Sequence, residues 1–79
     1  MQNNSILMRI QSIVQDVLDN NLLIINEDTE TTDVDGWDSL AHINIVSQVE
    51  SEFRVQFSLG ELANLSNVRN IIDAIREKS

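Results

Sequence analysis

The sequence has 79 residues, with 13 acidic against 5 basic side chains, no cysteine and a net charge of -8. This length predicts a single domain over 1–79, with a small core and little room for a deep catalytic pocket. The lack of cysteine excludes disulfides and thiolate metal sites. The acidity disfavours nucleic acid as a partner, because phosphate backbones would be repelled. No pattern typical of a signal peptide or membrane span is present, so we expect a cytoplasmic protein.

Apolar residues recur at three- and four-residue steps near the start of the chain, which predicts a helix over about 4–18. The long connection that follows, 19–38, has a length usual for functional loops. Its apolar run at 22–25 is expected to pack on the core as a loop, because no second strand is available to pair with it. The apolar residues of the helix are Ile6, Ile10, Ile13, Val14 and Val17.

Three more helices are predicted after this connection, over about 39–53, 59–65 and 67–77. The first of them has an apolar stripe of Leu40, Ile43, Val46, Val49 and Phe53, widened by Ile45. The last has an apolar stripe of Val68, Ile71, Ile72 and Ile75. The sequence therefore predicts an all-α fold, a small four-helix bundle of three longer helices and one short helix with a long first loop. No long apolar seam is left over, so we expect a monomer.

Residues that cap helices stand at the three later helix starts. Asp38 is a good N-cap for the helix over 39–53, and Ser66 is expected to cap the last helix. Ser58 and Glu61 match a Ser-x-x-Glu capping box, which predicts the start of the short helix.

Asp38 and Ser39 stand where the long loop meets the second helix, within Asp-Gly-Trp-Asp-Ser-Leu at 35–40. A hydroxyl in the first turn of a helix lies near unpaired N–H groups, which together with the helix dipole favour an attached anion such as a phosphodiester. The Asp38 carboxylate would repel that anion, and a divalent metal between the two would remove the conflict. This chemistry suits a serine that another enzyme modifies. The alternative is that both residues only cap the helix.

This motif and the order of the helices resemble the acyl carrier protein family over nearly the whole chain. In that family Asp-Ser-Leu opens the second helix after a long loop, as it does here at 38–40. Glu-Ser-Glu-Phe at 50–53 is similar to the acidic end of the family's second helix, and Ser-Asn-Val at 66–68 to the start of its last helix.

The resemblance implies a 4'-phosphopantetheine arm, which a holo-carrier synthase (a phosphopantetheinyl transferase) would move from coenzyme A to the hydroxyl of Ser39. Asp38 would contact Mg²⁺ only during this transfer. The arm would carry acyl intermediates as thioesters, so the chain is expected to be a carrier with no catalytic residue and no structural metal. Acyl-transferring and acyl-modifying enzymes with basic docking surfaces are the expected partners. The candidate partner contacts are Trp37, Leu40, Glu50 and Glu52.

A long acyl chain would need an apolar cleft beside the second helix. The candidate lining residues are Ile45, Val49, Leu62 and Ile71, with plain core as the alternative for each. Ala41, His42 and Asn44 replace the acidic residues that commonly follow the motif in fatty-acid carriers. This favours a free-standing carrier of a specialised polyketide, lipid or surface-carbohydrate pathway. Trp37 replaces the second glycine of the peptidyl-carrier pattern, which disfavours an aminoacyl cargo but leaves it open as the alternative.

Three other functions fit parts of the sequence. A calcium loop with Gly36 at its sixth position would place Thr31 first and His42 twelfth, where EF-hands need an acid and a bidentate Glu. Ser39 and His42 share a helix face, but a serine enzyme also needs an oriented base and an oxyanion site, and no pocket is evident. A non-carrier acidic bundle for protein interaction stays open, although it does not explain the placement of the Ser39 motif.

Overall fold

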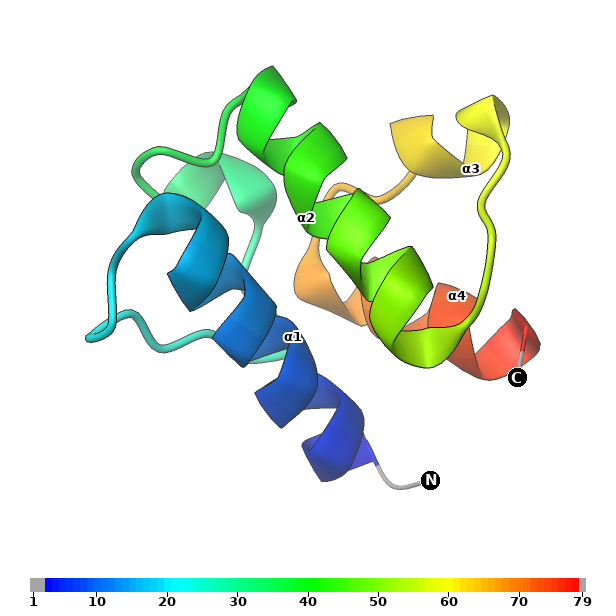
Figure 1. Cartoon of the computed structure of the whole chain (residues 1–79), viewed down its shortest axis with the longest axis horizontal. Coiled ribbons are helices and arrows are strands. Elements are labelled where there is room, and N and C mark those ends of the chain that lie inside the picture. The colour runs from blue at the N-terminus through cyan, green and yellow to red at the C-terminus, as the bar shows by residue number, and fades with distance from the viewer. Residues whose placement is uncertain (1–2, 79) are drawn as a thin grey trace.

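The computed structural model describes residues 3–78, so residues 1, 2 and 79 of the predicted domain lie outside the described part. Within that part the predicted all-α fold is confirmed, since the helices follow one another as a small bundle without strands (Figure 1). The helices are α1 (Asn3–Leu18), the short 3-10 helix η1 (Thr31–Asp33), α2 (Ser39–Phe53), α3 (Leu59–Ala63) and α4 (Val68–Lys78). None of the helices in 3–78 is both long and apolar enough to cross a membrane.

The core is built mainly from the apolar stripes of α1, α2 and α4. α1 packs against both α2 and α4. The buried cluster contains Ile6, Ile10, Val14, Ile25, Trp37, Ile45, Val46, Val49, Leu65, Val68, Ile71, Ile72 and Ile75. α3 contributes no buried residue. Among the α-helices it therefore has the weakest attachment to the core.

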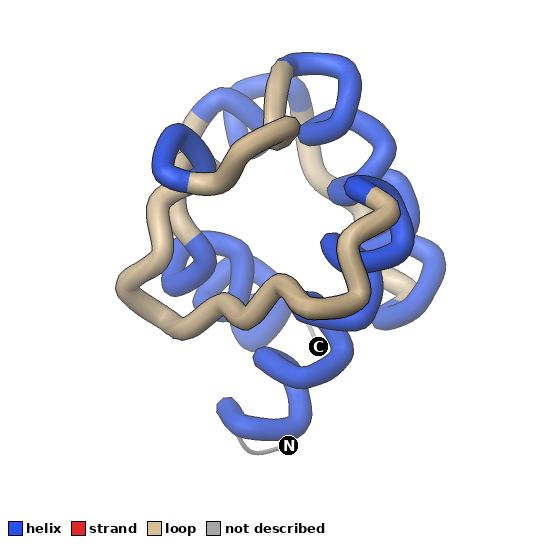
Figure 2. Tube along the Cα trace, turned by 90° about the vertical axis from the view of Figure 1, so that its left-hand side faces the viewer, coloured by secondary structure: helices blue, strands red, loops and turns tan. Residues whose placement is uncertain are grey.

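The long loop, 19–38, runs across the helices and faces the viewer in Figure 2. Its middle is fixed to α1, because the Ile25 N–H donates to Gln11 Oε1 at 2.9 Å and Gln15 Nε2 donates to the Leu23 carbonyl at 2.7 Å. Ile25 is buried and Leu23 packs against the core. The run at 22–25 is thus a loop, as the sequence predicts, but only Leu23 and Ile25 pack on the core, whereas Leu22 and Ile24 are exposed.

The buried face of α2 differs from the predicted stripe at two positions. Leu40 and Ile43 are 74% and 60% exposed. The buried residues of α2 are Ala41, Ile45, Val46 and Val49. Apolar residues occur on both sides of this helix, so two stripes with helical spacing were possible, and the sequence pattern alone selected the wrong one for its first two turns.

The cap of α4 is also different from the prediction. The Asn70 N–H donates to Asn67 Oδ1 at 2.8 Å, so Asn67 caps the helix instead of Ser66. The helix begins one residue later than 67, which moves the capping position to Asn67. The capping box of α3 is present, with Ser58 and Glu61 each accepting the other's backbone N–H.

Candidate functional site

Ser39 is the first residue of α2 and its side chain is exposed. Asp38 caps the helix through Oδ1, which accepts the Ala41 N–H at 2.8 Å. The backbone N–H groups of Ser39 and Leu40 have no acceptor among the described residues. The hydroxyl therefore lies beside two free donors at the positive end of a helix dipole, an arrangement that favours an esterified anion.

A turn with a positive φ brings the loop into α2. Gly36 has φ +88°, a conformation that side chains rarely adopt, although a Cβ there would find only ordinary contact with Leu18 at 3.8 Å. The next residue, Trp37, is 7% exposed and belongs to the core cluster. Trp37 is thus an anchor that fixes the approach of the chain to Ser39, and little of its side chain is left for contact with a partner.

Trp37 is joined to His42 on the first turns of α2. The indole Nε1–H donates to His42 Nδ1 at 3.1 Å, and the ring planes are tilted by 34°. His42 is half-buried. Only the five-residue spacing of the two rings across a helix start pointed to this pair, and that spacing alone is weak.

A shallow depression of about 510 Å³ lies beside Ser39, between α2 and α3 with the loops that flank them. It is lined by Thr31, Thr32, Trp37, Asp38, Ser39, His42, Ile43, Leu62, Ala63, Leu65 and Ser66. The lining includes both apolar side chains and hydroxyls, and neither Lys nor Arg is present among these residues. An extended, partly apolar group attached to Ser39 would fit along it.

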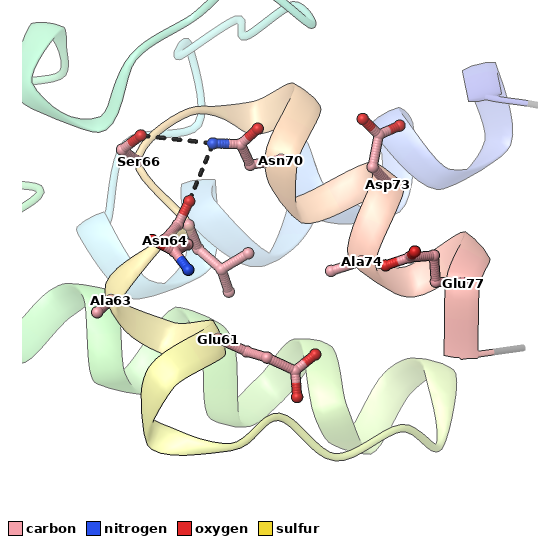
Figure 3. Close-up of a pocket in the computed structure, with 9 residues that line it drawn as sticks. Glu61, Ala63, Asn64, Ser66, Asn70, Asp73, Ala74 and Glu77 are labelled. Carbon is pink, nitrogen blue, oxygen red and sulfur yellow. Dashed lines mark hydrogen bonds between the residues drawn. The ribbon is translucent and has the colours of Figure 1, made fainter.

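A second depression of about 490 Å³ lies on the other side of α3, against α4. Figure 3 shows Glu61, Asp73 and Glu77 around it, with the Asn70 amide pointing toward Asn64 and Ser66. The N–H of Ser58 and the Lys78 ammonium hold the pKa of Glu61 below its usual range. No group of His, Cys, Asp or Glu in residues 3–78 is arranged to hold a metal ion. α3 thus has a hollow on each side.

The four residues suggested for an acyl cleft lie in two different environments. Ile45, Val49 and Ile71 are fully buried in the core cluster. Leu62 is half-buried in α3 and lines the depression beside Ser39. The depression beside Ser39 is therefore separate from the three buried residues in this conformation.

The two glutamates suggested as partner contacts also differ. Glu50 is half-buried and its Oε2 accepts the Phe57 N–H at 2.8 Å, which holds the turn after α2. Glu52 is 47% exposed and lies 3.6 Å from Arg9 Nε. Glu52 and Leu40 are thus accessible on α2, whereas Glu50 has a structural role.

Comparisons with known proteins agree with this geometry. A family described as "Phosphopantetheine attachment site" matches residues 9–75, a span that includes Ser39. The solution structure of a holo acyl carrier protein from Geobacter metallireducens is similar, with a TM-score of 0.82 and 33% sequence identity. The match covers 91% of this chain and 83% of that one.

Proposed function

Because the chain belongs to the acyl carrier protein family, whose members are non-catalytic carriers of a 4'-phosphopantetheine group, we propose that Ser39 is the attachment residue and that the chain presents acyl intermediates to partner enzymes. The observation that carries this proposal is the exposed Ser39 hydroxyl at the start of α2, beside two free backbone N–H groups. In the attachment step this hydroxyl loses its proton and forms the bond to phosphorus, while the nucleotide part of coenzyme A leaves.

The residues around Ser39 fit the arm that the family carries. The N–H groups of Ser39 and Leu40 are placed to bind the phosphodiester. The depression toward Leu62 offers apolar surface and hydroxyls for the part beyond it. When bound, the group supplies a thiol that holds the acyl cargo as a thioester. The chain itself supplies the attachment point and the surface that partners recognise.

Asp38 has a free oxygen for the attachment step. Its Oδ1 is used by the Ala41 N–H, while Oδ2 has no partner among the described residues. A carboxylate oxygen next to an incoming phosphate is a typical Mg²⁺ ligand. Asp38 would therefore contact Mg²⁺ during transfer, when both anions are close together.

Partners are expected to approach over the start of α2. Leu40 is 74% exposed directly after Ser39, and Glu52 presents a carboxylate further along the helix. Exposed charges of this kind mainly set orientation and association rate. Weak contacts suit a carrier, which must leave each partner quickly.

The proposal of a specialised polyketide, lipid or surface-carbohydrate pathway depends on the residues after the motif. Ala41 is buried, so its identity reflects packing and not recognition. Asn44 is exposed and His42 half-buried, and neither is the acid common in fatty-acid carriers. An aminoacyl cargo is the second candidate. Mass spectrometry of the arm on protein from its native host distinguishes an acyl cargo from an aminoacyl cargo.

The experiment that tests the proposed function is loading. The apo protein is incubated with coenzyme A, Mg²⁺ and a broad-specificity phosphopantetheinyl transferase, and its intact mass is measured. We expect the gain of one phosphopantetheine, and no gain for Ser39→Ala. Ser47→Ala, on an exposed serine of the same helix, is the matched control and should load like the unmodified sequence. Loading of Ser39→Ala would overturn the proposal.

A further inference from the structure

We propose that His42 is a positioning residue for the arm, and that its Nε2–H donates a hydrogen bond to the phosphodiester on Ser39. This inference rests on the proposed attachment at Ser39 and names a residue that holds the attached group in place. It is carried by three features of His42: the fixed protonation pattern of its ring, its position relative to Ser39, and the lack of any other partner for Nε2.

The hydrogen bond from Trp37 fixes which nitrogen of His42 carries the proton. An indole N–H can only donate, so Nδ1, which lies 3.1 Å from it, must accept. The imidazole is then neutral and its proton is on Nε2. Because Trp37 is held in the core, it also fixes the plane of the imidazole ring. The Trp37 side chain thus prepares Nε2 as a donor.

His42 lies next to the attachment residue on the surface of α2. It follows Ser39 by three residues, a spacing at which side chains on a helix are neighbours. Helical side chains lean toward the N-terminus, over the residues three and four positions earlier, which here are Ser39 and Asp38. Ser39 and His42 also line the same depression. The ring therefore leans toward the oxygen that would carry the phosphate.

Nε2 is available for a ligand. It has no hydrogen-bond partner among the described residues, and none of their buried side-chain nitrogen or oxygen atoms lacks a partner. An unpaired Nε2 must therefore be open to solvent.

The charge at the site explains why a donor is needed there. The Asp38 carboxylate stands next to the phosphate position and repels it, and no Lys or Arg lines the depression. The Nε2–H of His42 would add to the free N–H groups of Ser39 and Leu40. Three donors around the phosphodiester would offset the repulsion without a cation.

The test uses the intact protein in its apo and holo forms, with nuclear magnetic resonance of ¹⁵N-labelled histidine and of ³¹P. His42 is the only histidine, so its signals need no assignment. We expect the Nε2–H tautomer in the apo form, and a shift of the Nε2 and Hε2 signals on loading. An Nδ1–H tautomer, or identical signals in both forms, would overturn the inference.

Variants provide the second readout. His42→Phe should shift the ³¹P signal of the holo protein, because the donor is lost. His42→Gln should restore the signal, since the amide oxygen can accept from Trp37 while the amide N–H donates. A ³¹P signal unchanged in His42→Phe contradicts the role of His42. Intact mass is measured first: a sequence that does not load at Ser39 contradicts the proposed function, whereas normal loading with unchanged spectra contradicts only this inference.

Discussion

Asp38 combines two roles that single substitutions can separate. Its Oδ1 caps α2 through the Ala41 N–H, and its charge is the feature proposed to attract Mg²⁺. Asp38→Asn keeps a good cap, so the free energy of unfolding should stay nearly unchanged, while loading at limiting Mg²⁺ slows. Asp38→Ala loses the cap as well, at a cost of about 1 kcal/mol. Urea unfolding and initial loading rates measure the two effects. If Asp38→Asn loads with unchanged Mg²⁺ dependence, the metal role is wrong.

At the scale of single residues, the sequence predicts local features and misses those that depend on the path of the loop. Asp38 and Ser39 are identified from a motif of adjacent residues. The pairing of Trp37 with His42 depends on how the loop enters α2, which composition and spacing do not specify. For the same reason the sequence does not show that Glu50 and Glu52 have different roles, since only the turn after α2 brings the Phe57 N–H to Glu50.

Among the helices, α2 ends in a strained conformation. Arg54 follows the last turn with φ 56° and ψ 47°, a left-handed conformation that costs a residue with a side chain about 1–2 kcal/mol. Arg54→Gly removes this cost but adds about 0.5–1 kcal/mol of unfolded-state entropy. We expect a net stabilisation of about 0.5–1 kcal/mol, measured by urea unfolding. Arg54→Ala, which removes the charged side chain but keeps the Cβ, should give no gain. Equal stability of the two variants would contradict this reason.

α3 should be the helix most sensitive to acid. The pKa of Glu61 is lowered by the Ser58 N–H and by Lys78, so its stabilising contribution is present above the ordinary glutamate pKa. That contribution is lost as pH falls through the lower pKa of the folded form, below about pH 4.3. The amide chemical shifts of α3 should therefore show a transition below this pH. Glu61→Gln keeps the capping box and should remove this transition. If the transition of α3 is the same in both proteins, the local role of Glu61 is wrong.

The helices themselves follow from the sequence because periodicity and caps are local signals. The predicted ranges of about 4–18 and 39–53 differ by at most one residue at either end from α1 and α2. The sequence does not predict which face of α2 points to the core, because Leu40 and Ile43 have the same spacing as the residues that are buried. The apolar residues of α1 and α4 determine which stripe of α2 is buried.

At the scale of the whole molecule, a long acyl chain needs an apolar space that the bundle can open. α3 has no buried residue and a hollow on each side, which supports its displacement when a long chain is attached. An octanoyl thioester should then shift the methyl signals of the cleft candidates Ile45, Val49, Leu62 and Ile71, whereas an acetyl thioester should shift at most Leu62. The measurement is a methyl carbon–proton spectrum of each loaded form. Equal spectra for the two cargoes would show that the chain stays outside the core.

The fold class is predictable for this molecule because four amphipathic patterns without strands leave few alternatives to a bundle. The position of the long loop is not predictable, since it is fixed by hydrogen bonds between residues far apart in the sequence. The Ile25 N–H reaches Gln11, and the Thr31 N–H reaches the Ser66 carbonyl at 3.1 Å. Polar side chains that bind backbone groups leave no periodic signal in a sequence.

The central claim is that the group is esterified to Ser39, and locating it on the chain tests this most directly. Cleavage after glutamate releases the segment 31–50, in which Ser39 and Ser47 are the only serines. Tandem mass spectrometry of this segment from the loaded protein should place the whole added mass on the serine at 39. Finding it on Ser47, or on a segment outside 31–50, would contradict the account.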